Sequence, residues 1–413
     1  MISATKNLYQ QAYKGLTKRI WLLSVVMLIN RSGTMVLAFM TLYCVHLGYT
    51  IKEGSMVVAI YGIGAVIGAL LGGKISDKVG FYYTQFGALF FGGILFIVLG
   101  QMTTLTQISI CAFFLSMVNE AFRPANASAI AHYSNPQNRT QSFSLVRFAI
   151  NLGWGIGVAL GGFLASINYH LLFWVDGLTN MTAALFLLSV LPKVTLAQQK
   201  NTGAVKKAGM ERSPYRDKAF LYFLFFTILF SICFFQLFTT VPIFFKEHLH
   251  LSERKIGIVM AVNGVLIALL EMVLVYKLEG RRPYLFLMRV GAVLMGISFL
   301  LLDLPLANGF VVAMLAMLVL TFAEMVSMPF MNSYYIGRST EQTRGQYAGM
   351  YTMGWSAAQV IGSLAGGALA FGIGYQKLWI GVCLLCIIAA GGYFWMQHKF
   401  HPKPNELNAS VEA

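Results

Sequence analysis

The chain has 413 residues, of which 57% are hydrophobic and only 11% are charged, and its formal net charge is +15 at pH 7. Soluble domains carry about 25% charged residues, so this chain has too few charges to cover the two or three soluble domains that its length would allow. The composition therefore excludes an ordinary soluble protein and indicates that lipid surrounds most of the chain.

Twelve apolar segments are each long enough to cross a bilayer. A spanning helix needs about 20 apolar residues, because it rises about 1.5 Å per residue across a hydrocarbon core about 30 Å thick. The predicted spans are 19–46, 54–75, 82–101, 105–132, 140–166 and 169–191 in the first half, and 219–245, 255–277, 283–303, 307–335, 345–372 and 376–398 in the second. The sequence thus predicts an all-α membrane protein with twelve transmembrane helices in two pseudo-symmetric bundles of six.

One long polar stretch interrupts the spans. We expect an N-terminal six-helix bundle in residues 1–191, a cytoplasmic linker in 192–218, a C-terminal six-helix bundle in 219–398 and a cytoplasmic tail in 399–413. With both termini in the cytoplasm, 22 of the 30 Lys and Arg residues fall on the cytoplasmic side and five on the outer side. Basic loops favour the cytoplasm, so the count predicts this orientation. Anionic lipid headgroups then account for the net charge without nucleic acid.

The two halves also resemble each other. A shift of 205 residues aligns three pairs of distinctive residues, namely Pro124 with Pro329, Arg139 with Arg344 and Gln141 with Gln346. An even number of helices in each half gives both copies the same orientation in the membrane. Repeats of this kind place a substrate site between the halves and are typical of transporters that work by alternating access.

Ionisable side chains inside the spans are the candidates for proton coupling. Burying one costs about 2.5–3.5 kcal/mol on insertion scales, so such groups usually line cavities or form pairs. Glu324 is the first choice because no basic residue lies within one helical turn of it, and Glu271 is the second. We expect Asp176, nearer the outer side, to cap or bond a neighbouring helix.

Glu120 and Arg123 share one face of the fourth span, and Arg31 lies near the middle of the first. We expect these three residues to form a cluster, and its role has two interpretations. It is either an anion-attracting pocket or proton-coupled ion-pair switch, or it is a structural salt bridge that holds the two spans together.

Other polar residues within the spans are candidates for lining a substrate cavity, because amides are costly against lipid. The candidate amides are Asn30, Asn119, Gln236, Asn263 and Asn332. The seventh span is rich in phenylalanine, most of which we expect to contact lipid. Phe234 and Phe238 would form an apolar wall for bulky solutes if they point inward.

The loop after the second span carries a recognisable motif. Residues 73–80 read GKISDKVG, which resembles the signature of the major facilitator superfamily, although Phe81 and Tyr82 replace its closing basic pair. The resemblance implies a cytoplasmic latch formed by Gly73, Asp77, Lys78 and Gly80, in which Asp77 docks at helix ends of the other half. The alternative is an ordinary turn with lysines on the cytoplasmic side.

The fifth span resembles the glycine-rich motif of drug:proton antiporters in the same superfamily, although Gly157-Val158 stands where those proteins have Gly-Pro. Glycines spaced four residues apart let helices approach closely. The predicted packing glycines are Gly153, Gly157, Gly161, Gly362 and Gly366. Arg147, two turns into this span from the cytoplasmic side, either extends to the membrane surface or meets the latch loop.

Arg31, Arg123-Pro124 and Glu324 are similar to residues of the twelve-span drug:proton antiporters, and the likeness extends over essentially the whole chain. The resemblance implies a proton-coupled exporter of amphipathic drugs or metabolites in the bacterial inner membrane. We expect it to be a monomer that uses the proton gradient and no cofactor.

Two other functions remain open on the same scaffold. One is proton symport for uptake of peptides, sugars or organic anions, and the other is lipid flipping. The sequence contains no P-loop, HExxH or serine-elbow motif, so we do not expect an enzyme. Cys383 and Cys386 lie inside an apolar run, and we expect no metal site.

Overall fold

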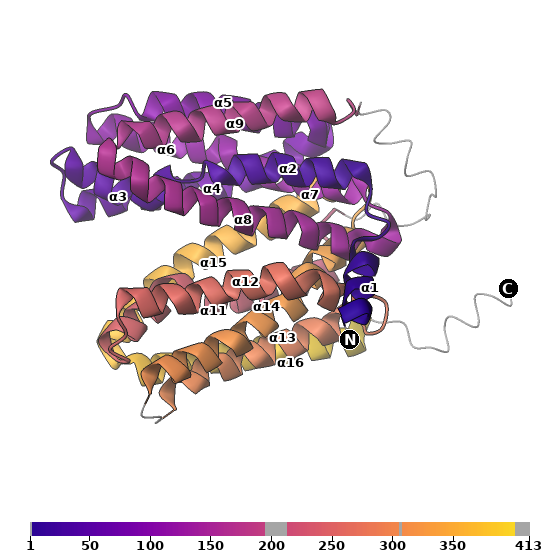
Figure 1. Cartoon of the computed structure of the whole chain (residues 1–413). Helices are drawn as coiled ribbons and strands as arrows, with labels where there is room; N and C mark the ends of the chain where they lie inside the picture. Colours follow the sequence, from indigo (N-terminus) through magenta and orange to yellow (C-terminus); the bar gives the residue numbers. More distant parts are fainter. Residues whose placement is uncertain (1, 195–212, 305–307, 401–413) are drawn as a thin grey trace, which may run out of the picture. The chain divides into compact units, whose positions relative to one another are not determined.

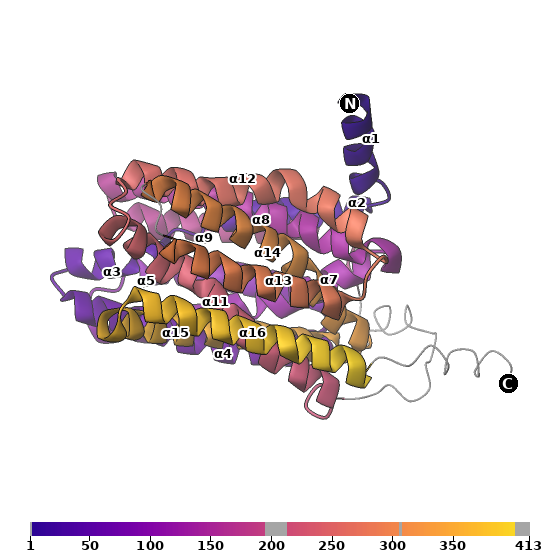
Figure 2. The same cartoon turned by 90° about the horizontal axis from the view of Figure 1, so that it is seen from below.

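The computed structural model describes residues 2–194, 213–304 and 308–400, and within these ranges all regular secondary structure is helical (Figures 1 and 2). The first half contains α1 (Ile2–Tyr13), α2 (Lys18–Ser32), α3 (Val36–His46), α4 (Ile51–Val79), α5 (Phe81–Leu99), α6 (Leu105–Glu120), α7 (Phe122–Tyr133), η1 (Pro136–Asn138), α8 (Arg139–Ile167) and α9 (His170–Val190). The second half contains α11 (Lys218–Glu247), α12 (Glu253–Leu278), α13 (Tyr284–Leu300), η2 (Leu301–Asp303), α14 (Gly309–Arg338), α15 (Arg344–Ile373) and α16 (Tyr375–Phe400).

The described ranges contain eleven helices that are long and apolar enough to cross a membrane. They correspond to eleven of the twelve predicted spans, and the remaining one, 19–46, is divided between α2 and α3. The protein is therefore an all-α membrane protein, as the sequence predicted. Most of the predicted linker and the C-terminal tail after residue 400 lie outside the described residues.

The first span was predicted as one helix, and the structure corrects this. The chain leaves the helical path between Ser32 and Val36, where Gly33 ends α2 with φ −100° and ψ 18°. Ser32 and Thr34 bond back to carbonyl oxygens of α2, which competes with continuation of the helix. The break leaves the backbone amides of Met35 and Val36 without acceptors in a continuous helix, and they donate to the Asp176 carboxylate of α9 instead.

The fourth span is interrupted more gently, at Ala121 between α6 and α7. Pro124 has no N–H to donate to the carbonyl of Glu120, so the hydrogen-bond ladder loses one rung at this point. The interruption lies between the two charged residues of this span, Glu120 and Arg123.

Local capping explains where several helices begin. Thr50 and Glu53 form a reciprocal capping box at the start of α4, and Thr104 and Gln107 form one at the start of α6. Gly80, with φ +98°, joins α4 to α5 in a conformation that favours glycine. These signals were present in the sequence near the predicted span boundaries.

The described helices form two compact units. The first comprises residues 1–214, 264–276 and 332–360, and the second comprises 215–263, 277–331 and 361–413. In the first unit α4 packs on α6, α5 on α9 and α2 on α8; in the second, α16 packs on α13 and α11. Figure 1 shows α5 beside α9, and Figure 2 shows α13 beside α16. The predicted division into two bundles of six remains a prediction.

An N-terminal helix, α1, precedes the first span and was not predicted. Figures 1 and 2 show that it runs across the direction of α2. Tyr9 donates to the backbone oxygen of Leu269 at 2.6 Å, and Tyr276 donates to Gln11 at 3.4 Å. These bonds attach α1 to α12 within the first unit.

Candidate functional site

The first unit contains a cluster of polar residues at the interruption of the fourth span. Arg123 lies 3.2 Å from Glu120, and their side chains are 40% and 17% exposed. Arg31 of α2 lies close enough to Glu120, Arg123 and Tyr61 to interact with them electrostatically. We call Arg31, Tyr61, Glu120 and Arg123 the arginine cluster. The structure thus brings together the three charged residues that the sequence grouped.

Arg31 is the unusual member of the arginine cluster. Its Nε atom is buried and has no hydrogen-bond partner among the described residues, and its side chain forms no ion pair with them. Glu120 instead pairs with Arg123. The arginine cluster therefore holds two guanidinium groups and one carboxylate, a formal excess of one positive charge.

A second charged pair connects α8 to α12. Arg147 Nη1 lies 2.6 Å from Glu271 Oε2, and the side chains are 17% and 3% exposed. The other carboxylate oxygen of Glu271 is buried, and the Ser144 hydroxyl lies close to the carboxyl group. The sequence singled out both residues but did not pair them.

Glu324 is buried in the second unit, on α14. The Asn263 amide donates to its Oε1 at 2.8 Å and to the Thr321 hydroxyl at 3.0 Å. Two polar residues from the predicted site, Asn263 and Glu324, are thus in direct contact across α12 and α14.

Asp77, at the end of α4, caps the N-terminus of α15. Its carboxylate oxygens accept from the backbone N–H groups of Gly345 at 2.7 Å and Gln346 at 2.9 Å. These amides have no acceptor inside their own helix, and an anion there also interacts favourably with the helix dipole. Lys78, next to Asp77, is exposed.

Glycines make this helix contact close. A Cβ added to Gly73 of α4 would overlap the carbonyl oxygen of Gly345, and one added to Gly349 would lie 2.7 Å from the carbonyl oxygen of Ala69. Real Cβ atoms do not approach backbone this closely, so α4 and α15 cross here only because these residues are glycines. The hydroxyl groups of Thr140 and Ser333, 2.6 Å apart, add a further contact between α8 and α14.

The predicted packing glycines lie at helix contacts in both units. In the first, Gly153 and Gly157 face the backbone of α2, and Gly161 faces Met35 and Phe39. In the second, Gly362 and Gly366 face α11, where Gln236 donates to the carbonyl oxygen of Gly362 at 2.9 Å. The fifth span (α8) thus packs against the first (α2), and the eleventh span (α15) packs against the seventh (α11) in the same way.

A largely buried ionic group joins the connection between the tenth and eleventh spans to His132 of the fourth. Arg344 lies 2.7 Å from Glu341 Oε1, and His132 Nδ1 lies 3.8 Å from Glu341 Oε2. Burial alone would raise the pKa of Glu341, but the His132 and Arg344 side chains together hold it below its ordinary value. The carboxylate is therefore kept ionised beside the helix terminus that Asp77 caps.

The other predicted cavity residues have different surroundings. Asn30 is buried and donates to Asn180 at 2.8 Å, so it joins α2 to α9. Asn119 packs beside Gly92. Phe234 is half-buried, Phe238 is 45% exposed and Asn332 is half-buried.

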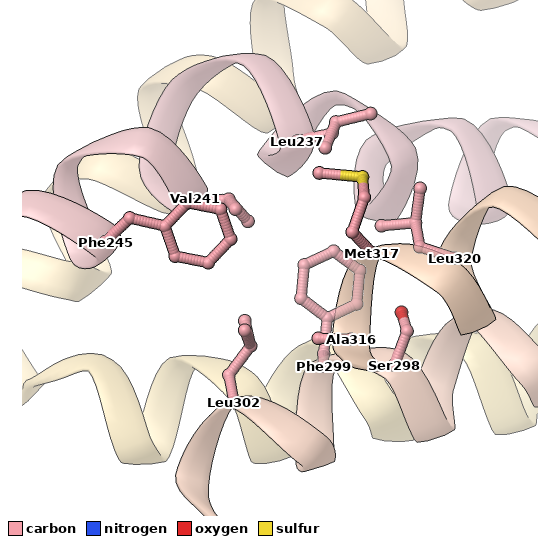
Figure 3. Close-up of a pocket in the computed structure, with 9 residues that line it drawn as sticks. All are labelled: Leu237, Val241, Phe245, Ser298, Phe299, Leu302, Ala316, Met317 and Leu320. Atoms are coloured by element: carbon pink, nitrogen blue, oxygen red, sulfur yellow. The ribbon is translucent and has the colours of Figure 1, made fainter. Parts of the chain in front are cut away.

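A small pocket in the second unit is almost entirely apolar (Figure 3). It lies between α11, α13, η2 and α14 and is lined by Leu237, Val241, Phe245, Ser298, Phe299, Leu302, Ala316, Met317 and Leu320. Its one hydroxyl group, of Ser298, donates to the backbone oxygen of Met295 at 2.7 Å. The pocket carries no charge and accommodates only an apolar group.

The sequence did not single out several residues of these sites, namely Tyr61, Thr140, His132 and Glu341. Tyr61 and Thr140 are neutral, His132 is the last residue of the predicted span 105–132, and Glu341 lies in a short connection between spans. The repeat offered one signal, because it placed Arg344 and Gln346 opposite Arg139 and Gln141 at the start of equivalent helices.

The fold and these contacts define a polytopic helical membrane protein with charged groups held inside its spans. A family model of the Major Facilitator Superfamily matches residues 20–363. The chain belongs to this superfamily, and it is a membrane transporter rather than an enzyme.

Individual relatives are distant but match most of the chain. The Na(+), Li(+), K(+)/H(+) antiporter of Planococcus maritimus is 24% identical over 402 residues, covering 90% of this chain and 93% of that protein. The quinolone resistance protein NorA of Staphylococcus aureus is 23% identical over 341 residues, covering 81% of this chain and 85% of that protein. A solved bacterial homologue of the iron transporter ferroportin, in an outward-facing state, has a TM-score of 0.71 at 15% identity, covering 92% of this chain and all of that one. At this identity the structural likeness shows the fold alone.

Proposed function

We propose that the protein is a proton-coupled secondary transporter that exports amphipathic drugs or metabolites by alternating access. The observation that carries the proposal is the buried pair of Arg147 and Glu271, 2.6 Å apart, which joins a helix of the first half of the sequence to a helix of the second. Relatives named as a cation/proton antiporter and as a quinolone resistance protein support antiport and drug export.

The pair provides a physical route for coupling. A proton that binds Glu271 removes the negative charge that holds Arg147, and its release restores the attraction. The Oε1 atom of Glu271, which does not contact Arg147, is a place for that proton. Because protonation changes the interaction between α8 and α12, it biases any conformational equilibrium in which these helices separate.

Glu324 is the second carboxylate in this proposal. The Asn263 amide, itself bonded to the Thr321 hydroxyl, donates to the Glu324 carboxylate. We assign the conformational effect of protonation to Glu271 and a proton-binding role to Glu324.

Asp77 acts as the latch in the proposed cycle. Its two hydrogen bonds to α15 stabilise the conformation in which α4 and α15 are in contact. Alternating access requires these bonds to break in the opposite conformation. We also infer a bacterial inner-membrane location with both termini in the cytoplasm, from the distribution of Lys and Arg.

The test uses purified protein in liposomes with an acidic lumen and a panel of a lipophilic cationic dye, a dipeptide and an organic acid. Antiport against protons leaving the lumen accumulates the transported solute, whereas symport moves it outward. We expect accumulation by the wild type and its loss in Glu271→Gln and Glu324→Gln. Glu247→Gln, at the exposed end of α11, is the matched control and should behave as wild type. Solute movement that ignores the pH gradient would refute proton coupling.

A further inference from the structure

Within the described ranges, no acidic residue forms an ion pair with Arg31, the source of the excess positive charge in the arginine cluster. Arg31 forms no ion pair with a described residue, and its Nε atom is buried without a hydrogen-bond partner. Glu120 interacts electrostatically with Arg31, but it already binds Arg123 at 3.2 Å. Asp176 also lies within electrostatic range of Tyr61, but its oxygens accept from backbone amides of Met35 and Val36.

An uncompensated guanidinium inside a membrane span is costly, so such a group usually binds something. Arginine is well suited to a carboxylate, sulfonate or phosphate, because its planar fork donates two parallel hydrogen bonds. A structural role alone does not explain the charge. At the repeat offset of 205 residues, the equivalent of Arg31 is Gln236. Gln236 is a neutral amide that donates to the carbonyl oxygen of Gly362 in α15.

Aromatic side chains also lie near Arg123. Tyr335 and Tyr351 are both within its electrostatic range, and their rings stack with centroids 4.5 Å apart. The Trp355 ring follows, 6.1 Å from that of Tyr351. All of these residues belong to the first unit. A ligand held by the two arginines would therefore lie beside a run of aromatic rings.

We propose that Arg31 and Arg123 bind the anionic group of an amphipathic aromatic anion, with Tyr335, Tyr351 and Trp355 next to its ring system. This inference rests on the proposed function and narrows its substrate class to organic anions. Arg31 contributes an unpaired charge. Arg123 shares its charge between Glu120 and the ligand, so Glu120 competes with the ligand's anionic group.

The test compares three probes of one shape and different charge: 2-naphthoate, 2-naphthamide and 2-naphthylmethylammonium. Their dissociation constants are measured by calorimetry on the full-length protein in detergent, without a pH gradient. We expect the wild type to bind 2-naphthoate about tenfold or more tightly than the amide, a difference of about 1.4 kcal/mol. Arg31→Gln should reduce this preference to about twofold or less, and Arg31→Lys should keep part of it because lysine retains the charge but not the fork.

A variant that binds the anion more tightly than the wild type distinguishes the proposal from a folding defect, because misfolding would weaken binding. Glu120→Gln removes the competing carboxylate, so it should tighten 2-naphthoate binding several-fold while leaving 2-naphthamide unchanged. Arg254→Gln, which removes an exposed arginine at the start of α12, is the charge-matched control and should not change the preference. Equal binding of all three probes by the wild type, no binding of 2-naphthoate, or weaker 2-naphthoate binding in Glu120→Gln would overturn the proposal. Anion-selective binding without proton-driven transport would instead overturn the coupling proposed above and leave this site intact.

Discussion

The contact between Asp77 and α15 allows a quantitative prediction. The amides of Gly345 and Gln346 lie in the first turn of α15 and have no carbonyl acceptor within it. The residue that precedes α15, Thr343, does not cap them, because its hydroxyl accepts from the Thr340 backbone N–H instead. Protection of these two amides from solvent exchange therefore depends on Asp77.

Replacing Asp77 by asparagine keeps the shape of the side chain but removes its charge and one acceptor oxygen. A hydrogen bond to a charged group contributes about 1.5–3 kcal/mol. The loss of one such bond should speed exchange at these amides by about ten- to a hundredfold, since each 1.4 kcal/mol is a factor of ten. Asp77→Ala should have a larger effect because no acceptor remains.

Hydrogen–deuterium exchange with mass spectrometry on a peptide that covers the start of α15 measures this effect. Lys74→Gln, an exposed position one turn before Asp77 in α4, is the control and should leave the exchange unchanged. If exchange at the start of α15 is the same in wild type and Asp77→Ala, Asp77 does not cap this helix in solution, and the reasoning about the latch is wrong.

Three further predictions concern stability, measured as Tm of the protein in detergent. Asp176→Ala should lower the Tm, because the amides that start α3 lose their acceptor at about 1–3 kcal/mol each, while Asp176→Asn should have a smaller effect. A Tm for Asp176→Ala equal to wild type would show that the break in the first span does not need this residue. Gly153→Ala should also lower the Tm, because its Cβ would lie 2.9 Å from the Leu28 carbonyl oxygen, whereas Gly155→Ala, with open space around it, should not. Equal values for these two variants would contradict the close packing of α8 on α2. The folded pKa of Glu341 is lowered, so its carboxylate stabilises the protein above the unfolded pKa of about 4.3, and the contribution is lost as the pH falls through the folded pKa. The Tm difference between wild type and Glu341→Gln should therefore be largest at neutral pH and vanish in acid; a difference that grows in acid would reverse the assigned sign.

The helical class, the number of spans and the family were predictable from the sequence, because lipid requires long apolar helices and the motif at residues 73–80 is local. The break in the first span was not predictable in the same way. Gly33 is a weak signal within an apolar run, and the acceptor that stabilises the break, Asp176, lies 141 residues from Met35. Hydropathy contains no information on a contact of that range.

The candidate sites show the same limit. Arg147 and Glu271 were each recognised as charges within a span, but 124 residues separate them and their pairing depends on how the helices pack. The pairing of Glu120 with Arg123 was predictable, because a spacing of three residues within the fourth span places the two side chains on the same face. Helix α1 was missed because its sequence is polar, and bonds to α12 hold it in place.

The central claim is that this transporter couples solute movement to protons through Glu271. The most direct measurement loads proteoliposomes with a pH-sensitive dye, imposes a gradient of transported solute but no pH gradient, and records the pH of the lumen. We expect a pH change in the lumen as solute flows through the wild type, and a solute flux with little or no proton movement in Glu271→Gln. Solute flux through the wild type at constant pH of the lumen, or an unchanged proton signal in Glu271→Gln, would contradict it.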